Sequence, residues 1–447
     1  MPDAVYRMLT LLCSLVLTVP VGTNLGLLHL LWMLVSGHLL TTRGAVIPGL
    51  SATGLSERAV RRAWAALGQG DWASGPLLAR WAALVEAEGR FVPAQHGGYH
   101  PVAVDVTAFF RPQLQGCPTT HYQAEAGKAL PAIPLGLLGR VGRVGTQRLA
   151  LPRAFVRADP ADPRTSTHQL LVVRAAVAQC APDEVLVFDA GFGLALLHEE
   201  GATRYVVRCA KNDTFRRASP PPYRGRGRRP SRGLHVRPLP RTHNGRLIAA
   251  TPPDRPATWT EDDAVLRAEI WDDLVRPAAA PGAPSFMVVA LYDPRYRDPL
   301  LVATPLPLTA PDLRACYPDR WAIEQIPLAA KEMLGVAHSF VHAPETCPRL
   351  PELALLAGAI LSYAAATAPA VPTGFWDRRP RPTPGRLRRV LARCPFPHDF
   401  PLPARLREKA SPTAHLPTGF WGQRRRCVRP PEAAPPPSPA PPQSQAA

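Results

Sequence analysis

The chain has 447 residues, 46% of them hydrophobic, so it is long enough for two to four domains and at least one large core. Its 52 Lys and Arg exceed its 34 Asp and Glu, and the formal net charge of +18 favours a polyanionic partner, nucleic acid before an anionic membrane. The eight cysteines include no CxxC pair and no Cys-His cluster at zinc-ligand spacing, which argues against a zinc finger and favours reduced thiols in a cytosolic protein.

The N-terminal region contains a long stretch without charge. No Lys, Arg, Asp or Glu occurs between Arg7 and Arg43. Pro20 and Gly22 divide this stretch into two apolar segments of about a dozen residues each, too short for either to span a membrane alone. We therefore predict buried helices within a soluble helical N-terminal domain, residues 1–95, with membrane insertion as the alternative.

A basic helix follows the apolar segments. Ser56 is placed to cap a helix whose polar side carries Arg58, Arg61 and Arg62. A short helix, a glycine-containing turn and a basic second helix are the outline of a helix-turn-helix, which would give this domain a role in binding DNA ends. The alternative is an ordinary amphipathic helix, and a further helix closes the region near residue 92.

From residue 99 the pattern changes to strands, which we assign to the first part of a catalytic core, residues 96–212. The segment YHPVAVDVTAFF alternates around Asp105, and two more strands join at Gly145. A helix (STHQLLVVRAAVAQC), a buried strand ending on Asp189, a short helix through Leu194 to Glu199 and a last strand (RYVVRCAKN) follow. The predicted order is strand, strand, strand, helix, strand, helix, strand.

Three acids in this layout suggest a metal site. Asp105 lies within an apolar strand, where a carboxylate is costly unless it binds a metal or hydrogen-bonds, and Asp189 ends the fourth strand. Glu324 lies on a later helix, residues 317–331, with Tyr317, Arg320 and Lys331 at offsets that place all four within roughly 60° on one face. Each acid alone has an ordinary alternative as a surface or capping carboxylate.

Together the acids and the element order predict an α/β protein with an RNase H-like catalytic core, a mixed five-stranded sheet with helices on both faces. Three carboxylates suit two Mg²⁺ ions, with Mn²⁺ as an alternative, held about 3.5 to 4 Å apart to activate a nucleophile and stabilise the leaving oxygen in phosphodiester cleavage. In this hypothesis Asp105 bridges the ions, Asp189 completes one site and Glu324 the other.

The motif residues carry a resemblance to a known family. Tyr317, Arg320, Glu324 and Lys331 match the signature Tyr-x2-Arg-x3-Glu-x6-Lys. With this signature the chain resembles bacterial insertion-sequence transposases of the DDE class, in particular the cut-and-paste group that forms DNA hairpins. VAVDVTAFF and VFDAGFGLALLHEEGATRYVVRCAKN look like the first and second acid motifs of that group, and the looser resemblance extends from about residue 20 to about residue 425.

The resemblance implies roles for further residues. Tyr317 and Arg320 would grip the phosphate beside a flipped base, and Lys331 would contact terminal DNA. Arg208 and Asn212 fall on the family's strand after the second acid. The family also has a β-rich insertion, here residues 213–283, in which Trp259 and Trp271 are the candidates to hold the flipped base; the alternative for each is a core tryptophan.

The resemblance also implies partners and location. The partners would be double-stranded DNA, both the terminal inverted repeats and the target, and a second copy of the chain in a homodimeric synaptic complex. The location would be the bacterial cytoplasm, at the nucleoid and not in a membrane. An RNase H-like nuclease without strand transfer and a catalytically inactive DNA-binding relic remain as alternatives.

Two positions depart from the family pattern. Pro327 stands three residues after Glu324, where an aromatic residue is usual, and a proline inside a helix removes a hydrogen bond and kinks the chain. The first acid motif has Val106 where glycine is commoner. Neither change removes a ligand, but both motivate the inactive alternative.

The remaining segments complete the predicted organisation. The insertion contains an Arg-, Gly- and Pro-rich loop at residues 216–233 that either contacts the DNA backbone or is solvated. Residues 284–372 form the second part of the core, with two strands, a helix start capped by Thr309 and Asp312, and an apolar helix covering the sheet. A basic C-terminal segment, 373–428, and a disordered Pro- and Ala-rich tail, 429–447, follow.

Overall fold

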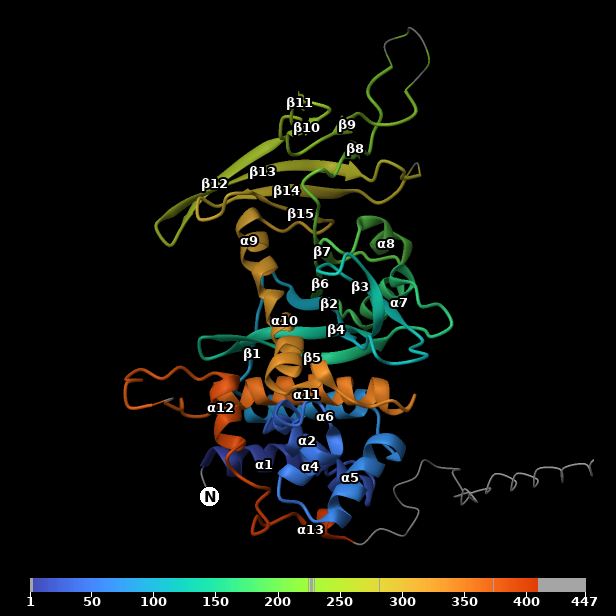
Figure 1. The fold of residues 1–447 in the computed structure, drawn as a ribbon. Coiled ribbons are helices and arrows are strands. Elements are labelled where there is room, and N and C mark those ends of the chain that lie inside the picture. The colour runs from blue at the N-terminus through green and yellow to red at the C-terminus, as the bar shows by residue number, and fades with distance from the viewer. Residues whose placement is uncertain are drawn as a thin grey trace, which may run out of the picture.

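The computed structural model describes residues 3–223, 225, 228, 230–280, 282–372 and 374–408 (Figure 1). The predicted tail, 429–447, and residues 409–428 of the basic C-terminal segment lie outside the described residues. So do four positions of the arginine-rich loop, 224, 226, 227 and 229.

The N-terminal region is helical, as predicted. Its helices are α1 (Asp3–Val16), α2 (Thr23–Val35), α3 (His38–Thr41), α4 (Val46–Ala52), α5 (Glu57–Gln69) and α6 (Ser74–Glu88). The uncharged segments form α1 and α2, and nearly every side chain of α2 is buried within the protein. Ser56 caps α5, since its hydroxyl accepts a hydrogen bond from the Ala59 amide at 3.4 Å.

The centre of the molecule is a mixed sheet whose first strands follow the predicted order. They are β2 (His100–Phe110), β4 (Lys128–Val144), β5 (Gln147–Arg157), β6 (Glu184–Phe188) and β7 (Tyr205–Arg208). Their spatial order is β5-β4-β2-β6-β7; β4 is antiparallel to β2 and β5, whereas β6 and β7 are parallel to β2. Gly145, at φ 57°, makes the β4–β5 turn. The helices α7 (Thr165–Gln179) and α8 (Leu194–Glu199) connect the parallel strands.

The prediction of a five-stranded sheet is wrong in size, because the sheet continues past β7 to thirteen strands. Strand β15 (Leu300–Thr304) pairs with β7, β14 (Phe286–Tyr292) with β15, and β13 (Ala264–Val275) with β14. The other members are short or peripheral: β1 (Val92–Pro93), β3 (Thr120–Gln123), β8 (Phe215–Arg217), β9 (His235–Val236) and β12 (Arg255–Glu261). A separate hairpin joins β10 (Arg241–His243) to β11 (Arg246–Ile248). The insertion thus shares backbone hydrogen bonds with the core.

The segment predicted as one helix over residues 317–331 is divided. Helix α9 (Ala310–Asp319) begins at the predicted Thr309–Asp312 capping box, and α10 (Trp321–Leu328) follows after Arg320. A π-helical turn (Ala329–Met333) then widens the backbone, with the Leu334 amide bonded to the Ala329 carbonyl at 3.0 Å. Pro318 and Pro327 lie inside α9 and α10, and neither has an amide proton for the helical ladder, which explains the irregular run.

Helix α11 (Thr346–Thr367) lies between the sheet and the N-terminal helices (Figure 1). Its length and composition would allow it to cross a membrane. However, 89% of its most apolar 18-residue stretch is buried inside the protein, as in a core helix of a soluble protein. The chain ends with α12 (Pro384–Leu391) and α13 (Ala404–Arg407), which pack on the N-terminal helices.

Candidate active site

Two of the three predicted acids lie side by side on the sheet. Strands β2 and β6 are parallel, and Val104 pairs with Phe188. Asp105 and Asp189 are the next residues on these two strands, so the register places them next to each other where β6 ends. The third acid, Glu324, comes from α10, which packs against β2, β4 and β5.

The electrostatics confirm that the acids share one region. Burial raises the pKa of Asp105 from its ordinary 3.8 to about 6, and the negative charges of Glu324 and Asp189 also raise it. The positive charge of Arg320 acts in the opposite direction. The structure therefore brings Asp105, Asp189, Glu324 and Arg320 within electrostatic range of one another.

Arg320 is the most enclosed charge of the site. Its side chain is 5% exposed, and Nη2 donates to Glu324 Oε1 at 2.7 Å. Its Nε and Nη1 atoms are buried without a hydrogen-bond partner. Buried donors without partners are costly, so a guanidinium held this way is suited to an anion that supplies the missing acceptors.

Tyr317 and Arg208 reach Asp189. The Tyr317 hydroxyl donates to Asp189 Oδ1 at 3.2 Å, and Arg208 Nη1 lies 4.0 Å from the same oxygen. The Tyr317 ring also lies under Arg320, whose guanidinium carbon is 5.7 Å from the ring centroid. Burial raises the pKa of Tyr317, so this hydroxyl keeps its proton and acts as a donor at neutral pH.

Lys331 lies on the side of Asp105. Its Nζ is 5.4 Å from the centroid of the Phe109 ring on β2. Burial lowers the pKa of Lys331, and the negative charge of Asp105 opposes that shift. The π turn that carries Lys331 thus still directs this ammonium toward the site, although the helix is irregular there.

The carboxylates do not form a closed metal-binding cluster in this conformation. Among the described residues, no three His, Cys, Asp or Glu side chains lie close enough together to hold a metal ion. The donor chemistry suits a hard cation such as Mg²⁺, because all three candidates are carboxylates. Glu324 faces Arg320 instead, and its 40% exposure leaves it room to turn.

The two candidate tryptophans differ. Trp271 is fully buried, and its Nε1 donates to the carbonyls of Thr251 and Pro252, both at 3.0 Å, so it is a core residue. Trp259 lies on β12 and packs, partly buried, against the core cluster of β13 and β14. Neither tryptophan touches the acids. Asn212, another predicted DNA contact, is exposed in the loop directly after β7.

Sequence reasoning missed an aromatic turn that meets the loop after β7. Residues 293–299 connect β14 to β15 and meet the loop after β7, where Lys211 Nζ lies 2.6 Å from Asp298. Tyr296 in this turn is 67% exposed, beside a cavity of about 300 Å³ that Arg267, Tyr292 and Arg297 also line. The segment YDPRYRDP, in which Tyr296 stands between two arginines and is bracketed by two prolines, was the available signal.

Asp319, inside the signature, was also missed. Its carboxylate is 2% exposed and lies 2.8 Å from His96 Nε2 and 3.1 Å from Arg148 Nε. These contacts fix the end of α9, one residue before Arg320, to β5 through Arg148 and to the loop before β2 through His96. They join positions far apart in the sequence, so no local pattern announces them.

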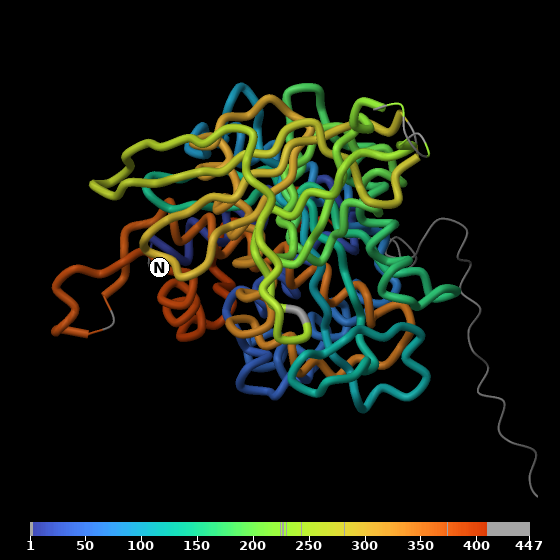
Figure 2. Tube along the Cα trace, turned by 90° about the horizontal axis from the view of Figure 1, so that it is seen from above, coloured from blue at the N-terminus to red at the C-terminus, as the bar shows by residue number. Residues whose placement is uncertain are grey.

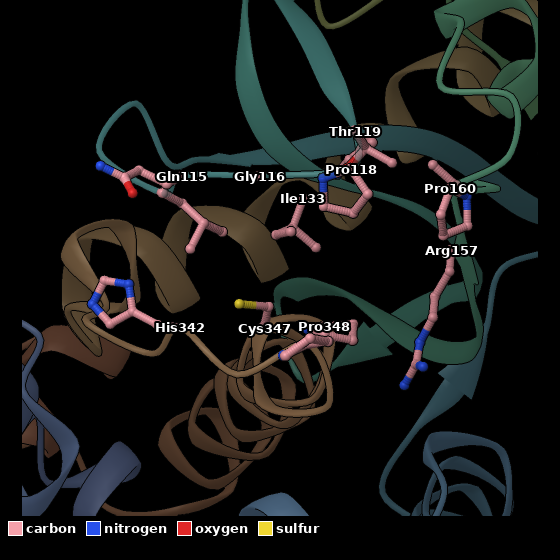
Figure 3. Close-up of a pocket in the computed structure, with 14 residues that line it drawn as sticks. Gln115, Gly116, Pro118, Thr119, Ile133, Arg157, Pro160, His342, Cys347 and Pro348 are labelled. Atoms are coloured by element: carbon pink, nitrogen blue, oxygen red, sulfur yellow. The ribbon is translucent and has the colours of Figure 1, made fainter. Parts of the chain in front are cut away.

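A cavity away from these residues is shown in Figure 3. It encloses about 700 Å³ between the loop after β2 and the start of α11, and Ile133, Cys347 and Pro348 line its apolar wall. The cation on its rim, Arg157, is paired with buried Glu352 at 2.6 Å. This cavity contains none of the site residues.

Comparison with models of known protein families gave no match, and neither did a search of characterised proteins.

Proposed function

We propose that the protein is a DNA transposase of the DDE class, which cleaves the ends of an insertion sequence and joins them to target DNA. The observation that carries the proposal is the juxtaposition of Asp105, Asp189 and Glu324 around the buried Arg320. The strand order β5-β4-β2-β6-β7, with two parallel strands after an antiparallel meander, supports an RNase H-like core for this chemistry.

The proposed chemistry assigns a role to each side chain. Asp105, Asp189 and Glu324 would hold two Mg²⁺ ions, which supply an activated water and stabilise the leaving oxygen. Arg320 supplies unpartnered donors for the scissile phosphate, and Tyr317 adds a neutral hydroxyl beside it. Glu324 must release Arg320 to become a ligand, so phosphate binding by Arg320 and metal binding by Glu324 would favour each other.

The surface around the acids suits DNA. Arg208 and Asn212 are exposed at and just after the end of β7, and Lys331 lies close enough to Asp105 to feel its charge. Tyr296 lies in the turn between β14 and β15 and Trp259 lies on β12, with Tyr296 the more exposed. We propose that the terminal duplex lies over this edge, that the active assembly is a homodimer on paired ends, and that it works in the bacterial cytoplasm.

The decisive experiment compares Glu324→Gln with the parent protein on duplex DNA taken from the two flanks of the gene. Parent protein should cut this DNA with Mg²⁺ and not with EDTA, and Glu324→Gln should lose cutting by at least about a hundredfold while still binding DNA. Glu332→Gln, an exposed acid on the same segment, is the matched control. Equal cutting by Glu324→Gln and parent would refute the assignment.

A strand-transfer assay with pre-cut ends and a target plasmid separates the alternatives. Joined products support a transposase. Cutting without joining would indicate an RNase H-like nuclease, and DNA binding without cutting would indicate an inactive relic.

A further inference from the structure

A five-residue sequence occurs twice in the C-terminal part of the chain. Pro-Thr-Gly-Phe-Trp stands at residues 372–376 and again at residues 417–421. Arginines follow each copy within five positions: Arg378, Arg379 and Arg381 after the first, Arg424, Arg425 and Arg426 after the second. The second copy lies outside the described residues, so the structural argument rests on the first.

The first copy forms an exposed aromatic turn, residues 374–379. The Asp377 amide donates to the Gly374 carbonyl at 3.1 Å, and the Arg378 amide donates to the Trp376 carbonyl at 3.0 Å. Phe375 is 96% exposed and Trp376 67% exposed, with their rings edge to face at 5.1 Å. Two adjacent large aromatic side chains are rarely left in water without a partner.

The glycine of the motif has a specific reason. The Trp376 ring folds back over Gly374, and a Cβ on that residue would lie 2.4 Å from the ring. Any larger residue would push the indole away. Asp377 is held to Arg386 of α12 at 2.6 Å, which fixes the turn to the body of the protein. Glycine at position 374 thus leaves room for the tryptophan ring. A positive φ angle is not the reason for it.

The surroundings of the aromatic turn are strongly basic. Between residues 377 and 393 there are seven arginines and a single acid, Asp377, which is already paired with Arg386. Arg378, Arg379 and Arg381 are exposed next to the rings, and Arg389 is exposed on α12. A surface with this excess of guanidinium groups fits a polyanion better than an apolar protein pocket.

We propose that the aromatic turn is a second DNA contact, separate from the acids, at which Phe375 and Trp376 insert against bases of a double helix while Arg378 and Arg379 bind its phosphates. Aromatic side chains that wedge into base steps beside arginines are a known way of holding bent duplexes. This inference rests on the proposed function for its choice of DNA. Figures 1 and 2 show the loop before α12 projecting from the same side of the molecule as the β12–β13 hairpin, so one duplex can reach both.

The experiment measures affinity for a labelled duplex of arbitrary sequence as a function of salt, in EDTA so that no cutting occurs. Phe375→Ala/Trp376→Ala should weaken binding roughly tenfold with an unchanged salt slope, because rings contribute by stacking. Arg378→Ala/Arg379→Ala should reduce the slope by about 1.8, the value for two phosphate contacts. Gly374→Ala should reproduce the aromatic variant, since it displaces the indole without changing charge.

Two control variants test whether removing charge or an exposed aromatic ring anywhere on the surface has the same effect. Arg405→Ala/Arg407→Ala removes the same charge from exposed positions of α13, and Tyr122→Ala removes an exposed aromatic ring from β3. Both should retain the parent's affinity and slope. Because the same five residues recur at 417–421, Phe420→Ala/Trp421→Ala is added to the aromatic variant, and the loss should then increase.

Two results would overturn the inference. One is an affinity equal to that of the parent protein when Phe375, Trp376, Phe420 and Trp421 are all changed to Ala. The other is a loss of self-association, measured by sedimentation, with DNA affinity intact, which would assign the turn to a protein contact. Neither result bears on Glu324, whose cutting assay tests the proposed function separately.

Discussion

The Tyr317 hydroxyl donates a hydrogen bond to Asp189 Oδ1 at 3.2 Å and so joins α9 to the end of β6 across 128 residues of sequence. Tyr317→Phe removes this bond and keeps the ring under Arg320. We expect end cleavage to fall about tenfold, because Asp189 loses its orienting donor, while stability changes by about 1 kcal/mol. Tyr363→Phe is the control, since its hydroxyl donates to Glu88 at 2.7 Å away from the acids. Equal cleavage in the two variants would contradict this role.

Asp105 should make stability depend on pH in the metal-free protein. Its pKa is raised from 3.8 to about 6, mainly by burial, so the folded state holds a proton that the unfolded state releases. Below about pH 4 the carboxyl is protonated in both states, and Asp105→Asn should then have little effect on stability. Above about pH 6 the buried charge is fully present, and Asp105→Asn should stabilise the fold by on the order of 2 kcal/mol.

Urea unfolding in EDTA between pH 4 and pH 8 measures this difference. Asp183→Asn, an exposed position just before β6, provides the control. A stabilisation by Asp105→Asn that did not grow from pH 4 to pH 7 would mean that burial does not govern this carboxyl.

Asp319 should position Arg320 without touching DNA. Its contacts with His96 and Arg148 fix the junction of α9 and α10. Asp319→Asn keeps the shape and loses the charge, so the guanidinium one residue later should be misplaced. We expect cleavage to fall roughly 10- to 100-fold with DNA affinity unchanged. Asp312→Asn, which weakens the cap of α9, should lower the melting temperature and spare cleavage; the reverse pattern would refute the positioning role.

Arg349 should be a main link between α11 and the N-terminal helices. Its guanidinium donates to the carbonyls of Leu67, Gly68, Gly70 and Trp72, at 2.6 to 3.1 Å, and lies 4.5 Å from the Trp72 ring centroid. A cation at this position also interacts favourably with the negative, C-terminal end of the α5 dipole. Arg349→Ala should lower the free energy of unfolding by about 3 kcal/mol.

Two further variants test that account. Arg349→Lys should recover less than half of the loss, because an ammonium cannot present the planar fork of donors. Arg80→Ala, which removes one bond to the Ser14 carbonyl at 3.2 Å, should cost about 1 kcal/mol or less. A comparable loss for Arg80→Ala would show that the four-carbonyl arrangement is not special.

Features encoded by neighbouring residues could be predicted from the sequence. The glycine at the β4–β5 turn, the Ser56 cap and the Thr309–Asp312 box all depend on a few adjacent positions, and the structure has each where expected. The strand around Asp105 is also present, but it is mostly buried on both faces and its burial does not alternate. The neighbouring positions of Asp105 and Asp189 follow from the parallel register of β2 and β6, in which Val104 pairs with Phe188 and β2 continues to Phe110. The sequence predicted both acids and the element order but not this register.

What could not be predicted depends on distant contacts or on backbone detail. Pro318 and Pro327 were visible, but the division into α9, α10 and a π turn depends on how the sheet and α11 hold this segment. Arg320 and Glu324 are four residues apart, a spacing that lets their side chains meet on a helix, but the spacing alone does not decide whether Glu324 pairs with Arg320 or turns toward the other acids. The two strands after residue 284 were predicted to belong to the core, but the continuation of the sheet through β13 into the insertion depends on long-range pairing that local patterns do not report.

The pairing of β15 with β7 has a mechanical consequence. A module joined by two flexible linkers can swing about a hinge, but strands that continue a sheet cannot separate from it without breaking ladder hydrogen bonds. Tyr296 at the β14–β15 turn therefore changes its position relative to Asp189 only as the sheet twists. The distance between these two positions should vary little on binding DNA, and deleting residues 213–283 would leave β14 as an uncovered edge prone to aggregation.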